Sequence, residues 1–124
     1  MLQNEAITDQ IIAAAIHVHR TLGPGLLESV YEACLSHELT KRGLSVRRQV
    51  ELPVIYDGVR IDCGFRIDIL VEGTVVVELK CAEKVHPVHE AQLMTYLRLS
   101  GHSTGLLLNF YTKVLKDGIL RRVV

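Results

Sequence analysis

The chain has 124 residues, of which 48% are hydrophobic and 23% are charged. This composition excludes a disordered chain, and the length suits a single domain with its own core over residues 1–124. Lys and Arg together number 14, as do Asp and Glu, so the formal net charge is zero. A histone-like protein held on nucleic acid by bulk charge alone is therefore disfavoured, whereas a local basic surface is not.

The N-terminal residues and the cysteines bear on the compartment. Glu5 and Asp9 stand where a signal peptide would carry positive charge, and no apolar stretch is long enough for a membrane span. The three cysteines form no CxxC pair, which we interpret as buried thiols in a reducing compartment. We therefore expect a soluble, cytoplasmic protein with no membrane partner.

Two amphipathic helices are predicted at the start of the chain. Apolar residues recur at helical spacing over residues 5–21, and the Gly-Pro-Gly run at 23–25 ends this helix. A second apolar stripe extends from Leu27 to Leu39, and Gly43 closes that helix.

The pattern then changes to that of strands. Asp-Gly at 57–58 and Glu-Gly at 72–73 predict hairpin turns. The remaining predicted elements are strands over 46–56, 60–71 and 74–80, a helix from Pro87 to Gly101, and strands over 104–110 and 118–123. This order predicts an α+β fold with a mixed sheet.

Three charged side chains lie on two neighbouring predicted strands. Alternation places Glu78 and Lys80 on one face of their strand. A two-residue hairpin loop would turn Asp68 away from Glu78, whereas a three-residue loop, or a bulge of the same parity, makes them diagonal neighbours. We predict the second arrangement, with Asp68 opposite Val76. Two such carboxylates suit Mg²⁺, with Mn²⁺ as a substitute, and Lys80 can then face a phosphate or orient a water. From these residues alone, a solvated surface cluster is the alternative.

Two further patterns favour a site over a surface cluster. Glu28 begins the second helix at the edge of its apolar stripe. The alternative is an ordinary acidic residue in the first turn, which the helix N-terminus favours. His89, Gln92 and Tyr96 fall on one face of the later helix, as residues lining a polar cleft would. The alternative for this face is a core boundary with Tyr96 half-buried.

The segment GLLESVY at 25–31 carries a GxxExxY signature. The sequence resembles the small bacterial and archaeal GxxExxY proteins, a branch of the PD-(D/E)XK nuclease-like superfamily, over nearly its whole length. The resemblance also covers the D…ExK residues Asp68, Glu78 and Lys80, the HEAQLMTYL helix and the LLLNF strand. The proline that names the superfamily is replaced here by Ile67.

The resemblance implies a restriction-endonuclease-like αβββαβ core, here with an extra N-terminal helix, and metal-dependent phosphodiester cleavage. It implies that Asp68 and Glu78 bind the metal and that Glu28 aids it directly or through water. It further implies that Lys80 orients the attacking water or stabilises the transition state.

Three residues of the later helix have supporting roles in this comparison. The resemblance implies that Gln92 and Tyr96, matching a QxxxY element, support the site and contact nucleic acid. His89 would lie beside them, orienting a ligand or contacting a phosphate.

The leading hypothesis is a Mg²⁺-dependent nuclease or nuclease-like phosphodiesterase that acts on DNA or RNA. The alternative is a non-catalytic nucleic-acid- or protein-binding module that retains the fold. Basic pairs at 41–42, 47–48 and 121–122 favour a homodimer with a widened cleft, although 47–48 would equally suit the polar start of an edge strand. A protein partner for targeting is also expected for so small an enzyme.

Overall fold

The computed structural model describes residues 4–124. Its elements in chain order are α1 (Glu5–Leu22), α2 (Glu28–Lys41), β1 (Val46–Glu51), β2 (Val54–Tyr56), β3 (Val59–Ile61), β4 (Arg66–Val71), β5 (Val75–Lys80), α3 (Pro87–Ser100), β6 (Thr104–Asn109), η1 (Leu115–Gly118) and β7 (Ile119–Val123). The predicted α+β class is confirmed. The series α2, β1, β4, β5, α3, β6 forms the predicted αβββαβ core, and α1 is the extra N-terminal helix.

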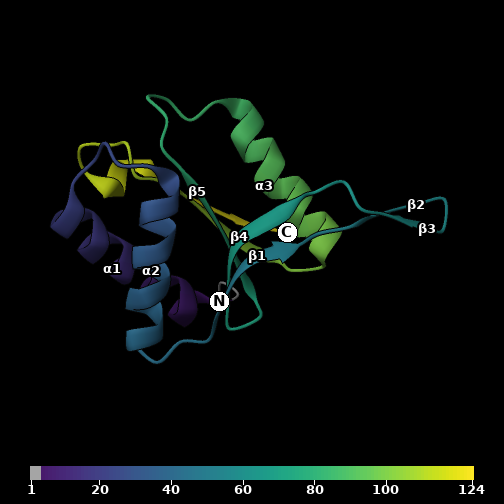
Figure 1. Cartoon of the computed structure of the whole chain (residues 1–124), viewed down its shortest axis with the longest axis horizontal. Helices are drawn as coiled ribbons and strands as arrows, with labels where there is room; N and C mark the ends of the chain where they lie inside the picture. The colour runs from purple at the N-terminus through teal and green to yellow at the C-terminus, as the bar shows by residue number, and fades with distance from the viewer. Residues whose placement is uncertain (1–3) are drawn as a thin grey trace.

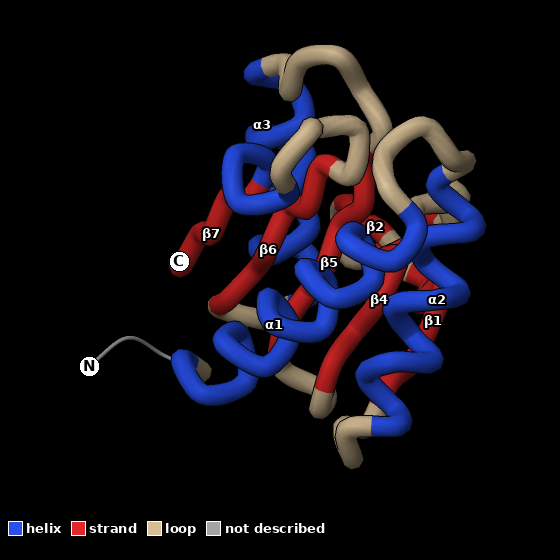
Figure 2. The backbone as a smooth tube through the Cα atoms, turned by 90° about the vertical axis from the view of Figure 1, so that its left-hand side faces the viewer, coloured by secondary structure: helices blue, strands red, loops and turns tan. Residues whose placement is uncertain are grey.

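The main sheet has five strands in the order β1-β4-β5-β6-β7. β5 and β6 are parallel, and the other neighbours are antiparallel, so the predicted mixed sheet is confirmed. Helices α1 and α2 cover one face and α3 covers the other (Figures 1 and 2). Because both faces are covered, the central strands carry apolar side chains on both sides.

Two hydrophobic clusters lie on the two faces of the sheet. The first packs α1 and α2 against side chains such as Ile69, Val77 and Leu106. The second packs α3 against side chains such as Leu70 and Val76. Neighbouring strand residues thus alternate between the two clusters, as the pleat of a strand requires.

The alternation of β4 breaks at one position. Strict alternation would place Ile67 in the same cluster as Ile69 and Val71. Instead, Ile67 packs in the α3 cluster together with Leu70. The break in alternation falls at Asp68. Side chains before and after this residue therefore point to the sheet faces in a different phase.

The two long strands expected over 46–56 and 60–71 are each interrupted, so the prediction of unbroken strands is wrong. Their outer halves form a separate two-stranded arm, β2 and β3, which projects from the body (Figure 1). Pro53 lacks an N–H for the main ladder, and Gly64 takes a left-handed conformation beyond β3. The predicted turn at 57–58 is present, with both φ angles positive as its type requires.

The hairpin between β4 and β5 has the predicted parity. Val71 pairs with Val75, so three residues lie between the paired positions. Glu72 and Gly73 both have positive φ, and the Thr74 N–H donates to the Val71 carbonyl at 3.0 Å. The register differs from the predicted one, because Ile69 pairs with Val77. The prediction that Asp68 lies opposite Val76 is therefore wrong, because Val76 pairs with Leu70, and Asp68 and Glu78 lie just beyond the last pair of the ladder.

The sequence predicted that the chain has no membrane span and that its cysteines are buried. Among residues 4–124, no helix is long and apolar enough to cross a membrane. Cys34 and Cys81 are half-buried and Cys63 is exposed, so the prediction of three buried thiols is wrong for Cys63. Cys63 lies in the loop between the arm and β4, a segment that the sequence pattern assigned to a strand.

Candidate active site

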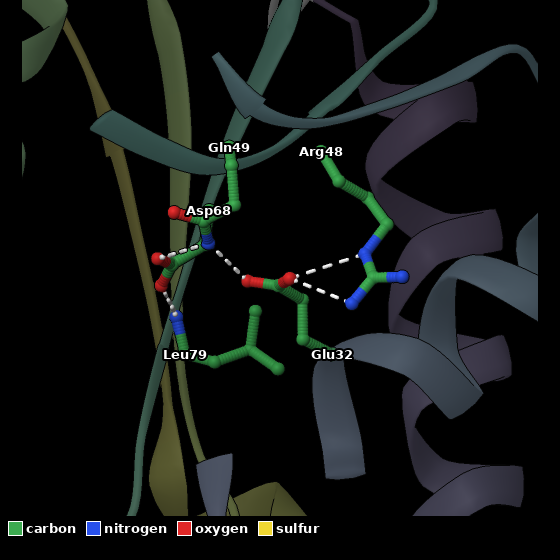
Figure 3. A network of polar contacts seen from close by, with 5 residues as sticks. All are labelled: Glu32, Arg48, Gln49, Asp68 and Leu79. Atoms are coloured by element: carbon green, nitrogen blue, oxygen red, sulfur yellow. Dashed lines mark hydrogen bonds and ion pairs between the residues drawn. The ribbon is translucent and has the colours of Figure 1, made fainter. Parts of the chain in front are cut away.

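The side chains of Asp68 and Glu78 lie where β4 and β5 part. The ladder between the strands ends at the Ile69–Val77 pair. Beyond it, Oδ2 of Asp68 accepts from the Leu79 N–H at 2.9 Å (Figure 3). Oε1 of Glu78 accepts from the Asp68 N–H at 3.3 Å. Each carboxylate thus takes up a backbone donor of the opposite strand, and this brings the two side chains together.

The electrostatics of the pair disfavour two negative charges side by side. Glu78 is only 4% exposed. Burial, followed by the negative charge of Asp68, raises the pKa of Glu78 to about 9, while the Lys80 ammonium opposes the rise. The pair therefore offers oxygen ligands whose mutual repulsion a cation would relieve.

Lys80, the last residue of β5, is tied to α3. Its Nζ donates to Oε1 of Gln92 at 3.3 Å, and Nε2 of Gln92 donates to the Tyr96 hydroxyl at 3.1 Å. Burial, followed by the charge of Glu78, raises the pKa of Tyr96. The i, i+4 spacing of Gln92 and Tyr96 thus places both on the Lys80 side of α3.

The His89 side chain caps the start of α3. Its Nδ1 accepts from the His86 N–H at 3.2 Å, while the His86 side chain accepts from the Val88 N–H. Burial, followed by the positive charge of Lys80, lowers the pKa of His89. The neutral ring then carries its proton on Nε2, since Nδ1 is the acceptor.

Glu28 approaches the same site from α2. Burial raises its pKa, the charge of Lys80 opposes that rise, and the charge of Asp68 adds to it. A backbone hydrogen bond from Cys81 also lowers the pKa. Glu28 is therefore within electrostatic reach of the residues on β4 and β5.

The loop before Glu28 is held by the tyrosine of the GxxExxY segment. The buried Tyr31 hydroxyl donates to the Gly23 carbonyl and accepts from the Leu26 N–H at 3.2 Å. The Tyr31 ring stacks on Phe110, with centroids 4.5 Å apart. Gly25 has a φ of 98°, which side-chain-bearing residues rarely adopt. The segment thus fixes the start of α2 and with it Glu28.

The D…ExK pattern implies a divalent metal ion held by carboxylate oxygens. Within the described part of the chain, no group of three or more His, Cys, Asp and Glu side chains is arranged to hold a metal ion. The adjacent pair is Asp68 and Glu78, and its like-charge repulsion and oxygen donors fit a hard divalent cation. Glu28 does not complete a three-ligand group in this geometry.

The structure adds two residues that sequence reasoning missed, Glu32 and Gln49, and joins them to Arg48 of the predicted 47–48 pair (Figure 3). Oε2 of the buried Glu32 accepts from Nε and a terminal nitrogen of Arg48 at 3.1 and 2.9 Å. Nε2 of Gln49 donates to Oε1 of Glu32 at 2.6 Å and lies 3.5 Å from Oδ1 of Asp68. One signal was available, because Glu32 stands four positions after Glu28 and shares its side of α2. No signal marked Gln49.

Some of the basic residues expected to flank a cleft have acidic partners within the chain. Arg48 pairs with Glu32, and Arg122 pairs with Glu90 at 2.6 Å. Strands β1 and β7 form opposite edges of the sheet, so the 47–48 and 121–122 pairs lie far apart in one chain. The homodimer therefore stays a prediction.

Two hollows flank the end of β5. One, of about 540 Å³, is lined by Lys80, His89 and Gln92 together with Phe65. The other, of about 580 Å³, is lined by Glu28, Cys81 and residues that include Leu27 and Tyr111. Phe65 is 40% exposed and Tyr111 is 44% exposed. Each hollow thus has an exposed aromatic ring beside the charged residues.

The loop that leaves Lys80 is clamped by the end of β6. Oδ1 of Asn109 accepts from the Ala82 N–H and the Tyr111 N–H, both at 3.2 Å, and its Nδ2 donates to the Ala82 carbonyl at 2.9 Å. The Phe110 N–H also donates to the Lys80 carbonyl at 2.9 Å. Asn109 is 2% exposed, so this clamp is a buried one.

Comparison with known proteins agrees with this geometry. The model of one family, described as the PD-(D/E)XK nuclease superfamily, matches residues 5–123. The comparisons with curated proteins and with solved structures gave no match. The family match does not itself single out the GxxExxY branch, which stays a resemblance. Because the match spans almost the whole chain and the paired carboxylates stand on its β4 and β5 strands, this chain belongs to the PD-(D/E)XK nuclease superfamily.

Proposed function

We propose that this chain is a divalent-metal-dependent nuclease that hydrolyses phosphodiester bonds of nucleic acid. The observation that carries the proposal is the pairing of Asp68 with Glu78 at the opening between β4 and β5, with Lys80 two residues further along. Members of the superfamily generally use divalent metal ions, and Mg²⁺ or Mn²⁺ suits these oxygen donors.

Asp68 and Glu78 would hold the cation, and Glu28, which does not complete a three-ligand group with them, would aid it through a water. A bound divalent cation supplies a water of lowered pKa and neutralises charge on a phosphate oxygen. The carboxylates are held by backbone donors, so they are oriented before a cation arrives. Two protein carboxylates would suit Mg²⁺, which commonly keeps several of its waters.

Lys80 would act on the phosphate or on the attacking water. Gln92 directs the ammonium group through its Oε1, and Tyr96 in turn orients the Gln92 amide. A fixed positive charge beside a phosphate stabilises the charge that develops in the transition state. His89 lines the same hollow, where its Nε2–H can donate to a phosphate oxygen.

The two hollows give a path for the substrate. A strand whose scissile phosphate lies at Lys80 would direct its flanking nucleotides into them, where Phe65 and Tyr111 present ring faces. Base stacking on aromatic rings tolerates any sequence and requires unpaired bases. With a formal net charge of zero, stacking has more weight here than bulk charge.

The test begins with metal binding by the intact protein freed of metal with EDTA. Mn²⁺ at millimolar concentration should raise the melting temperature, because a ligand that binds the folded state stabilises it. Asp68→Asn should lose the rise, whereas Glu83→Gln, in the exposed loop after β5, should keep it. An unchanged melting temperature in the wild type would contradict the proposal.

The second part is cleavage. Single-stranded, double-stranded and branched DNA and RNA are incubated with the protein and Mn²⁺. Lys80→Ala should keep the Mn²⁺-induced rise in melting temperature and lose cleavage. Cleavage that survives in both Lys80→Ala and Asp68→Asn would assign the activity to another site or a contaminant. Metal and nucleic-acid binding without cleavage of any substrate would favour the binding-module alternative.

A further inference from the structure

Gln49 interrupts the pairing of β1 with β4. The register pairs Arg48 with Ile69 and Val50 with Ile67, and the pair between them, Gln49 with Asp68, is missing from the ladder. At this point Gln49 has a φ of 51°. The left-handed region is seldom occupied by residues other than Gly, Asn and Asp.

The positive φ of Gln49 is not explained by a turn or by a helix terminus. Four non-glycine residues between positions 4 and 124 have positive φ. Asn4 precedes a helix, and Asp57 and Glu72 stand in hairpin turns. Gln49 alone of the four lies inside a strand. Strained backbone persists where surrounding contacts impose it, and such positions cluster at functional sites.

The contacts of the Gln49 side chain show what the conformation achieves. Its amide lies between two carboxylates, donating to Glu32 at 2.6 Å and reaching Asp68 at 3.5 Å (Figure 3). The other oxygen of Asp68 is held by the Leu79 N–H at 2.9 Å. Both oxygens of Asp68 therefore have a protein donor, which restricts rotation of the carboxylate.

The Glu32 carboxylate is held in place by its own contacts. It is 8% exposed, and Arg48 neutralises it through two contacts to Oε2. Its Oε1 takes the Gln49 amide. Because the Arg48 guanidinium already neutralises its charge, Glu32 is an anchor and not a metal ligand.

We propose that Gln49 is a positioning residue that orients the Asp68 carboxylate for the cation. The left-handed backbone at position 49 places the amide between the anchor Glu32 and Asp68. This inference rests on the proposed function, because it gives Asp68 its role as a metal ligand. Groups that orient a metal ligand from behind typically contribute 10–100-fold to metal affinity or activity.

The test uses the strain to separate positioning from a purely structural tie. Gln49→Gly removes the amide and relieves the left-handed backbone, so its melting temperature without metal should stay within about 3 °C of the wild-type value. Its Kd for Mn²⁺, measured by titration calorimetry without nucleic acid, should rise about 10-fold or more. Cleavage measured at subsaturating Mn²⁺ should fall in parallel.

Two further variants make the result decisive. Gln49→Asn tolerates the left-handed backbone, but its amide is one methylene shorter, so its Mn²⁺ affinity should also fall. Arg48→Met leaves the Glu32 carboxylate buried without the guanidinium that neutralises it. The melting temperature should therefore fall by about 5 °C or more. Mn²⁺ binding should weaken less in this variant than in Gln49→Gly.

The outcomes separate this inference from the proposed function. Wild-type Mn²⁺ affinity in both Gln49→Gly and Gln49→Asn would overturn the positioning role and leave the proposed function standing. A melting temperature and an affinity that fall together in all three variants would make Gln49 a structural tie. A wild-type protein that binds no Mn²⁺ would overturn the proposed function and this inference with it.

Discussion

Asp68 and Glu78 each accept a hydrogen bond from the backbone of the strand that carries the other. Oδ2 of Asp68 takes the Leu79 N–H, and Oε1 of Glu78 takes the Asp68 N–H. Main-chain donors just beyond the last β4–β5 pair thus hold the two carboxylates. Because backbone donors move little, the orientation of the pair is set by the fold itself.

The pH dependence of stability should reveal the burial of Glu78. Its pKa is raised to about 9 in the folded chain from 4.5, so between these values the folded state holds more protons than the unfolded state. The contribution of Glu78 to stability is therefore greatest below about pH 5 and is lost as pH rises toward 9. In EDTA, we expect the wild-type free energy of unfolding to fall by several kcal/mol across this range, because each pH unit between the two pKa values contributes about 1.4 kcal/mol. Urea denaturation at several pH values measures it.

The matched variant for that experiment is Glu78→Gln. The neutral amide has nearly the same shape and cannot ionise, so most of the slope should vanish and the variant should exceed wild type in stability at pH 8. Glu83→Gln, in an exposed loop, should keep the wild-type slope. Equal slopes in wild type and Glu78→Gln would assign the pH dependence to another group.

Loss of the Tyr31 hydroxyl should loosen the loop before Glu28. Tyr31→Phe keeps the ring stacked on Phe110 and removes the hydrogen bonds to Gly23 and Leu26. We expect the free energy of unfolding to fall by about 1–3 kcal/mol, because buried backbone groups lose their partner. Denaturation measures this loss, and amide hydrogen exchange at Leu26 should become faster. Unchanged exchange there would show that the loop is held by other contacts.

The clamp on the loop after Lys80 should be costly to remove. Asn109→Ala deletes the three hydrogen bonds to Ala82 and Tyr111 at a buried position. We expect a loss of about 1–3 kcal/mol in the free energy of unfolding. Asn109→Asp retains the acceptor oxygen but places a negatively charged oxygen against the Ala82 carbonyl. This variant should therefore also lower the free energy of unfolding. A variant of either kind with wild-type stability would contradict the clamp.

The exposed aromatic rings beside the site should contribute to substrate binding. Phe65→Ala and Tyr111→Ala should each raise the Kd for a single-stranded oligonucleotide by about 10-fold, since stacking contributes roughly 1–3 kcal/mol per base. Fluorescence anisotropy with Ca²⁺ in place of Mn²⁺ measures binding without turnover. Affinity for a blunt duplex should change less, because its bases are not free to stack.

Tyr56 provides the control for these two variants. It is 67% exposed and lies on the β2–β3 arm, away from both hollows. Tyr56→Ala should therefore leave the affinity for the oligonucleotide unchanged. An equal loss in all three variants would point to a non-specific hydrophobic effect.

Local patterns in the sequence determined much of this protein. Alternation placed Glu78 and Lys80 on one strand face, and the Glu-Gly turn at 72–73 predicted the parity that lets Asp68 meet Glu78. Helical spacing predicted that Gln92 and Tyr96 share a side of α3. Each of these depends on residues close together in the chain, for which backbone geometry alone sets the relation.

The tertiary structure decided what depends on distant segments. The register of β4 against β5, the burial that raises the pKa of Glu78, and the meeting of Glu32 with Gln49 all require strands and helices to pack. The interruption of the long strands is another such outcome, since β1 and β4 pair in the main sheet while β2 and β3 pair in a separate one. Sequence spacing specifies which face a side chain takes, whereas packing between remote elements specifies what it meets there and how far its charge is removed from water.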